Sequence, residues 1–208
     1  MSHTFSIPKD PYDWNTPIYS KSRITIKPGL TVLVGCNGSG KTTLLSLIRK
    51  HMRHDNIPLF EYNNLHEGGK IAMDWALQIS GDMKILAALA TSSEGEQIYI
   101  NFGEMCEKLG GFMRKHSGAK ERWILFDAID SGLSIDNICE LKGFLKDLVI
   151  GEDPENVYVI ISANAYELCR GEQCFDVHNG KYVTFEDYED YRDFVLRSRD
   201  WKDKRYVP

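Results

Sequence analysis

Short apolar runs alternate with amphipathic segments from the start of the chain. Residues 23–27 (RITIK) and 30–34 (LTVLV) are rich in β-branched side chains and flank the turn pair Pro28-Gly29, so both are predicted strands. Apolar residues then recur at helical spacing, which predicts a helix over 42–53. The polar segment between this strand and this helix is therefore a tight strand-to-helix connection.

Beyond residue 58 the same alternation continues. Helical spacing predicts helices in four stretches: 63–91 (two helices around Gly81), 97–116 (weakened by Gly110-Gly111), 134–149 and 186–200. Short apolar runs predict strands at 59–62 (LFEY), 123–127 (WILFD) and 157–162 (VYVIIS), and a hairpin over 174–185 around Asn179-Gly180.

This order of elements predicts an α/β fold with a largely parallel central sheet flanked by helices. The length of 208 residues fits a single domain over 1–208. Within it, 63–116 is a small helical insertion, and 186–208 forms a C-terminal helix and tail.

Composition restricts the class of protein without naming it. Hydrophobic content of 42% and charged content of 26% are ordinary for a soluble globular domain. No apolar run reaches the roughly 18–20 residues that span a bilayer, and the N-terminus lacks a signal-peptide pattern. We therefore expect a cytoplasmic protein with no membrane partner. The five cysteines form no CxxC pair, so reduced, mostly buried thiols are expected.

The formal net charge of −5 argues against a surface built wholly for nucleic acid, although it leaves room for a local basic patch. Residues 197–205 (RSRDWKDKR) carry five basic and two acidic side chains. We expect this segment to be a solvated, frayed C-terminus rather than a binding surface.

Residues 35–42 (GCNGSGKT) carry the most specific chemistry in the chain. They match G-x-x-x-x-G-K-[ST] between an apolar strand and a helix, the setting of an ATP phosphate-binding loop. Glycines let successive N–H groups face the phosphates, the lysine meets the β- and γ-phosphates, and the threonine hydroxyl ligates Mg²⁺. The predicted nucleotide contacts are Asn37, Gly38, Ser39, Gly40, Lys41, Thr42 and Thr43.

Asp127 ends the buried strand 123–127 and is the second expected part of the site. A carboxylate at the carboxyl end of a parallel strand lies beside the phosphate loop and holds Mg²⁺ directly or through water. Thr42 and Asp127 are therefore the predicted metal ligands, and Lys41 and Asp127 are predicted to be catalytic.

With these motifs in order, the chain resembles the ATP-binding cassette (ABC) ATPases, and among them the small soluble proteins of the RecF and SMC group. The loop reads GCNGSGKTTLL, 92–97 (SSEGEQ) resembles the signature motif, and Ser131-Gly132-Leu133 resembles the loop that follows the acidic strand. Residues 157–164 (VYVIISAN) resemble the strand that ends at the switch histidine, and the likeness covers most of 20–185.

The resemblance implies a head-to-tail homodimer that forms on ATP binding. Each ATP would lie between the phosphate loop of one copy and Ser93, Gly95 and Glu96 of the other. An alternative for SSEGEQ is an ordinary helix start, with Ser93 as the N-cap and Glu96 completing a capping box. Both descriptions can hold for the same residues.

The departures from the family pattern are informative. The family places a glutamate after the strand aspartate to position or deprotonate water, and Ala128 stands there. The switch-histidine position falls on Ala163 or Asn164, and Gln78 is the sole candidate for the family's glutamine. The aromatic residue expected to stack on the base would be Tyr19 or Trp14.

Two explanations of Ala128 are open. A natural protein could use ATP to close a dimer with little or no turnover, or the chain could be an engineered variant that traps ATP. The otherwise well-kept DxIDSGLS pattern favours the second. Asp130 is a weaker candidate for the base because it lies two residues further into the loop.

The coupled process has several candidates. One is a DNA-related, defence or mobile-element function, with Arg114, Lys115, Lys120 and Arg122 as basic contacts. The others are a regulatory module that recruits a protein through 63–91, and a transporter ATPase subunit, which the missing glutamine and atypical signature disfavour. A small-molecule kinase also uses such a loop, but it needs neither SSEGEQ nor SGLS.

Overall fold

The computed structural model describes residues 2–13, 15–63, 94–151 and 155–205, with only the backbone for 94–103 and 149–151. Its centre is a six-stranded sheet in the order β4-β5-β6-β3-β7-β8, parallel except for β8, which runs antiparallel to β7. The strands in that order are β4 (Leu59–Asn63), β5 (Arg122–Asp127), β6 (Val157–Ser162), β3 (Gly29–Val34), β7 (Cys174–Asp176) and β8 (Lys181–Val183).

Alternate side chains of the central strands face two separate cores. In β3, Val32 and Val34 pack into one core, whereas Leu33 packs into the other. In β5, Phe126 and Trp123 divide in the same way, and the Trp123 ring stacks on Tyr158 of β6 with centroids 4.1 Å apart. Because both faces are covered, these strands are continuous apolar runs rather than alternating ones.

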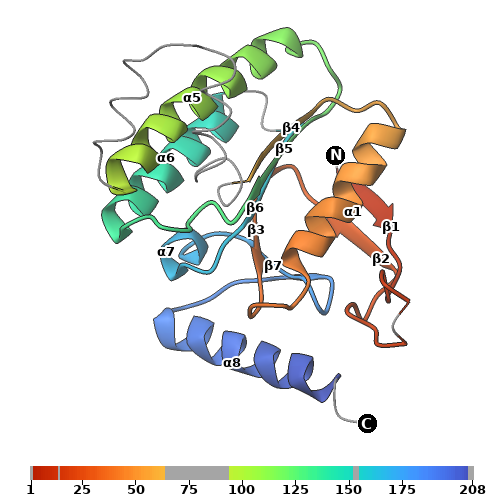
Figure 1. Cartoon of the computed structure of the whole chain (residues 1–208). Helices are drawn as coiled ribbons and strands as arrows, with labels where there is room; N and C mark the ends of the chain where they lie inside the picture. The colour runs from red at the N-terminus through yellow and green to blue at the C-terminus, as the bar shows by residue number, and fades with distance from the viewer. Residues whose placement is uncertain (1, 14, 64–93, 152–154, 206–208) are drawn as a thin grey trace.

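Helices and a small second sheet provide the covering layers. Figure 1 shows α5 (Glu94–Lys115) and α6 (Ile135–Gly151) on one side of the sheet, with α1 (Lys41–His54) on the other. β1 (His3–Ser6) pairs antiparallel with β2 (Arg23–Ile26) and lies on the same side as α1. The short α7 (Tyr166–Cys169) follows β6.

Most predicted elements within the described residues are confirmed. The strands, the hairpin at Asn179-Gly180 and the helices occur where the spacing placed them, and α5 continues through Gly110-Gly111. The predicted helices of 63–91 lie outside the described residues, apart from Asn63, which ends β4. Among the helices that the structure describes, none is both long and apolar enough to cross a bilayer.

The region predicted as a helical insertion, 63–116, contributes directly to the core through its second half. Met105, Leu109 and Met113 recur on one face of α5 and are buried against the sheet. All five cysteines are free thiols, and three of them, Cys36, Cys169 and Cys174, are buried.

The expectation of a frayed C-terminus is wrong for the residues up to 205. α8 (Tyr188–Lys204) begins at the N-cap Asp187, whose side chain accepts the N–H of Asp190 at 2.9 Å. Tyr191 and Phe194 enter the core, and Ser198 is only 4% exposed. Figure 1 shows this helix running past the end of β3, close to the start of α1. Apolar burial of one face fixes the tail there.

Candidate functional site

The phosphate loop connects β3 to α1 at the carboxyl edge of the sheet, and its backbone requires glycine. Gly38 and Gly40 have φ values of +78° and +106°, in the left-handed region. A side chain at Gly40 would also place its Cβ 2.6 Å from Cγ2 of Ile18. The loop therefore takes a shape that other residues cannot adopt without strain, and it opens directly into the N-terminus of α1.

Lys41 bends back over the loop instead of extending into solvent. Its Nζ donates to the carbonyl oxygens of Gly35 at 2.7 Å and Cys36 at 3.3 Å, and to Oδ1 of Asn164 at 3.0 Å. Burial lowers the pKa of this ammonium, and the nearby carboxylates of Asp127 and Asp130 oppose that shift. The group is thus a partly desolvated cation at the mouth of the loop.

Asp127 is held in place by donors from three different elements. Thr42 Oγ1 at the start of α1 donates to Asp127 Oδ1 at 3.2 Å, and Asn63 Nδ2 at the end of β4 donates to Oδ2 at 3.4 Å. The Ser162 hydroxyl at the end of β6 also donates to Oδ1, and Ser162 Oγ accepts the N–H of Ala128 at 2.9 Å. The predicted pair of metal ligands, Thr42 and Asp127, is therefore in direct contact.

This pair fits a magnesium ion by its chemistry. A hydroxyl and a carboxylate are hard oxygen donors, and Mg²⁺ in nucleotide sites takes one or two such ligands together with phosphate oxygens and water. Thr42 is exposed to solvent, whereas Asp127 is 8% exposed, so an ion at the hydroxyl would also meet the carboxylate.

A cavity of about 410 Å³ lies over the loop and collects most of the predicted residues. It is lined by Cys36, Asn37, Gly38, Gly40, Lys41, Thr42, Thr43, Asp127, Ala128, Ser162 and Asn164, with Tyr12, Thr16, Ile18 and Arg205 on its remaining walls. Of the loop residues predicted to contact nucleotide, Ser39 alone lies beneath this surface, 1% exposed.

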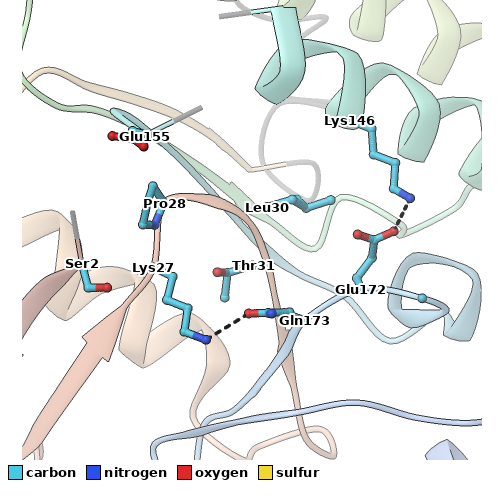
Figure 2. Close-up of a pocket in the computed structure, with 10 residues that line it drawn as sticks. Ser2, Lys27, Pro28, Leu30, Thr31, Lys146, Glu155, Glu172 and Gln173 are labelled. Carbon is cyan, nitrogen blue, oxygen red and sulfur yellow. Dashed lines mark hydrogen bonds and ion pairs between the residues drawn. The ribbon is translucent and has the colours of Figure 1, made fainter. Parts of the chain in front are cut away.

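A larger cavity, of about 830 Å³, lies at the opposite edge of the sheet (Figure 2). Four of its polar side chains are paired, because Lys27 donates to Gln173 at 3.3 Å and Lys146 pairs with Glu172 at 2.7 Å. It begins at Lys27 and Pro28, before β3, so it faces the amino ends of the parallel strands. The carboxyl edge is where open α/β sheets bind ligands.

Solved structures share this arrangement over nearly the whole chain. An ATP-binding cassette of an ABC transporter in its ADP conformation matches with a TM-score of 0.53 and 13% identity, covering 98% of each chain. A nucleotide-free ATP-binding cassette from an ABC transporter matches with a TM-score of 0.50 and 12% identity over 100% of both chains. Neither a scan against protein-family models nor a search of curated proteins gave a match.

The chain has the fold of an ABC-type P-loop ATPase. At this level of identity the likeness establishes the fold, and the chemistry has to come from the residues of the chain itself. Within that fold β5, β6 and β3 are adjacent and parallel, so Asp127, Asn164 and the phosphate loop lie at the same edge of the sheet.

Of the two aromatic residues expected to stack on the base, Tyr19 is not placed to do so. Tyr19 is 1% exposed and donates its hydroxyl to the Gly40 carbonyl at 2.9 Å, and its burial raises its pKa. It braces the loop from beneath, so it offers no face to a base. Tyr12 lines the cavity instead, 47% exposed, with its hydroxyl 2.9 Å from Thr43 Oγ1. Trp14 lies outside the described residues.

The signature-like segment is described in part. Ser93 lies outside the described residues, as does Gln78, while the described part of α5 begins at Glu94. Gly95 and Glu96 therefore lie in a helix, at the limit of the described residues. The pairing of this segment with a nucleotide held by a second copy stays a prediction.

The residues around Ala128 clarify which groups can act on water. Ala128 has a φ of +51°, and its side chain offers no proton acceptor. Asp130 Oδ2 accepts the N–H groups of Asn164 and Ala165 at 2.7 Å each, so this carboxylate anchors the loop after β6. Of the two residues that the resemblance aligns with the switch histidine, Ala163 is buried at 1% exposure, whereas Asn164 presents a polar side chain to Lys41.

The backbone demand at Gly40 predicts opposite effects of two glycine substitutions. Gly40→Ala should lower the free energy of unfolding by more than about 1 kcal/mol, because a Cβ meets Ile18 and the residue must keep a positive φ. Gly111→Ala in α5, where a Cβ meets nothing within 4 Å, should raise it by roughly 0.5–1 kcal/mol. Urea denaturation of both variants measures this, and equal effects would contradict the described loop.

Proposed function

We propose that the chain binds ATP with Mg²⁺ and acts as an ABC-type ATPase. The contact between Thr42 Oγ1 and Asp127 Oδ1 carries the proposal, since residues 85 positions apart come within 3.2 Å at one cavity. In the proposed complex, Lys41 contacts the β- and γ-phosphates, and Thr42 and Asp127 hold the metal. The metal would neutralise phosphate charge, and the chain's residues would orient the nucleotide.

The remaining loop residues bind phosphate through the backbone. Asn37 and Gly38 are exposed at the tip of the loop, and α1 adds the partial positive charge of its N-terminus from Lys41 onward. Ser39 packs beneath the loop and its N–H donates to the Cys36 carbonyl at 3.1 Å, so its contribution is to shape the turn. Tyr12, on the cavity wall beside Thr43, is placed to contact the nucleoside.

We further propose that a second copy of the chain completes each site. Asn37 and Gly38 on the loop and Gly132 after the acidic strand are all exposed, so these family interface segments are open to a partner. Gly95 and Glu96 of the signature-like segment lie in the described part of α5, and in the proposed dimer they face the γ-phosphate held by the other copy. The product is a nucleotide-sandwich homodimer that forms on ATP binding.

Sizing of the chain by light scattering, with and without ATP and Mg²⁺, tests this dimer. A doubling of mass with both present, and a monomer with ADP, is the expected result because the γ-phosphate joins the two halves. A monomer under all conditions would contradict the sandwich.

The turnover that we propose is slow or absent. Ala128 carries no acceptor at the position beside the metal ligand, and Asp130 is engaged with two backbone N–H groups. Asn164 contacts Lys41 and can donate a hydrogen bond, but an amide cannot remove a proton at neutral pH. ATP binding would therefore change the assembly of the chain without rapid hydrolysis.

Placing an acceptor at this position separates the two explanations of Ala128. Ala128→Glu should raise the rate of phosphate release by about 10²-fold or more if the rest of the site is built for hydrolysis. Ala128→Gln, which adds the same bulk without a base, is the matched control and should stay at the starting rate. No gain with Glu would contradict the engineered-variant hypothesis and leave an ATP-gated regulatory module.

We propose that the process driven by the dimer involves DNA. Fewer of the predicted basic contacts are available on the surface of the chain than the sequence indicated. Arg114, Lys115 and Lys120 are exposed, whereas Arg122 is 2% exposed and belongs to the core of β5. Salt-sensitive retention of DNA by the ATP-bound dimer alone is expected from such contacts. Absence of retention at low salt would exclude DNA and favour the alternatives of a recruited protein or a transporter.

A further inference from the structure

The last helix presents one continuous face to the phosphate loop. Ser198, Lys202 and Arg205 follow Tyr191 and Phe194 at spacings of three or four residues, so all five lie along one stripe of α8 and its end. The stripe is apolar where it meets the core, small and polar at Ser198, and cationic at its end. The cationic end lies beside the proposed ATP site.

Ser198 makes a buried hydrogen bond with the loop itself. The backbone N–H of Cys36 donates to Ser198 Oγ at 3.1 Å, and both residues are buried. A buried N–H costs free energy when it lacks an acceptor, so this hydroxyl holds the first half of the loop in its described shape. The carbonyl oxygen of the same residue, Cys36, accepts a hydrogen bond from Lys41 Nζ. Cys36 therefore links Ser198 to the lysine that is proposed to bind phosphate.

Lys202 lies across the tip of the loop. A Cβ built on Gly38 would be 3.3 Å from Lys202 Cδ, and the lysine side chain is only 26% exposed. Its ammonium pairs with the exposed carboxylate of Asp203 at 3.3 Å. Such a surface pair between adjacent residues is weak, so it can exchange for a stronger anion.

A cavity of about 550 Å³ beside these contacts is lined by residues of both α8 and the loop. This cavity adjoins the cavity of about 410 Å³ over the loop, here called the nucleotide cavity, because Cys36, Asn37 and Asn164 line both. Asn164 accepts Lys41 Nζ, which places the junction beside the lysine proposed to meet the terminal phosphates. The cationic side chains on the α8 wall are Arg192, Arg199 and Lys202.

These cations offset the partial negative charge at the C-terminal end of α8. α8 ends beside the loop, and a helix C-terminus carries a partial negative charge that repels phosphate. Lys202 lies on one side of the loop, whereas Arg205 lines the nucleotide cavity on the other and donates to the Ile18 carbonyl at 3.0 Å. The end of α8 thereby becomes cationic where it faces the site.

We propose that α8 supplies two functional residues to the nucleotide site of the same subunit. Lys202 donates to the terminal phosphate of a nucleoside triphosphate, and Ser198 is a positioning residue that holds the loop through Cys36. The inference rests on the proposed ATP function, and it adds to the phosphate loop an intramolecular cation from the end of the chain.

Affinities of ATP and ADP for paired lysine variants test the role of Lys202. Lys202→Met keeps the stem against Gly38 and removes the charge, so ATP affinity should fall about tenfold and ADP affinity much less. Lys204→Met removes an equal charge from an exposed side chain of the same helical turn and should change both by less than about twofold. Fluorescence titration with nucleotides at fixed salt measures both.

The outcomes separate this inference from the proposed function. Failure of the unchanged chain to bind ATP would overturn the proposed function. If the chain binds ATP but Lys202→Met and Lys204→Met change its affinity equally, only the proposed role of Lys202 is overturned. Both lysines would then act merely by offsetting the negative charge of the helix end.

Ser198→Ala tests positioning through the same titration. Because Ser198 acts on the loop and not on the terminal phosphate, ATP and ADP affinities should fall together by several-fold, unlike in Lys202→Met. Ser198→Gly, which also removes the hydroxyl, should reproduce the loss. Unchanged affinities together with a lower melting temperature would overturn the positioning role, because the hydroxyl would then serve stability alone.

Discussion

The contact between the Thr42 hydroxyl and the Asp127 carboxylate depends on three adjacent parallel strands that end at one edge. β5 delivers Asp127, β6 between them delivers Ser162, and β3 delivers the loop that leads to Thr42. The register fixes how far each strand extends, so a slip of one residue would turn Asp127 to the opposite face. The proposed metal site is therefore a consequence of sheet pairing, and the continuous apolar strands and both cores serve to maintain it.

The loop contains a buried cation, and an anionic ligand would offset the cost of desolvating it. Lys41 is 9% exposed, and its ammonium is satisfied by two carbonyl oxygens and one amide oxygen rather than by a carboxylate at hydrogen-bond distance. Its lowered pKa reflects the cost of desolvating that charge. A phosphate beside Lys41 would offset this cost. The braces beneath and beside the loop, Tyr19 and Ser198, hold this shape from protein atoms alone.

Local chemistry determined which parts could be predicted from the sequence. GCNGSGKT requires a glycine loop wherever it occurs, and WILFD and VYVIIS are too apolar to be anything but buried. Ser162 could have been found as well, because it is the polar end of a strand of the same length and type as the one that ends in Asp127. Other features depend on long-range packing and could not be predicted from the sequence. No local pattern indicates that Tyr19 is buried while Tyr12 is exposed, or that β1 pairs with β2.

The packing of α8 against the core could be predicted only in part from the sequence. Its stripe of Tyr191, Phe194 and Ser198 is visible in the sequence, but the many charges between 197 and 205 suggested solvent. Burial of one face outweighs those charges, because the long basic side chains extend along the surface while their ends stay solvated.

The central claim is that the chain binds ATP with Mg²⁺ through its phosphate loop. Calorimetric titration of ATP tests it most directly, with the unchanged chain in the presence and absence of Mg²⁺ and with Lys41→Met as the comparison. The account predicts binding of one ATP per chain that weakens about tenfold or more without Mg²⁺ and is lost in Lys41→Met. Binding that survives Lys41→Met, or that ignores Mg²⁺, would contradict it.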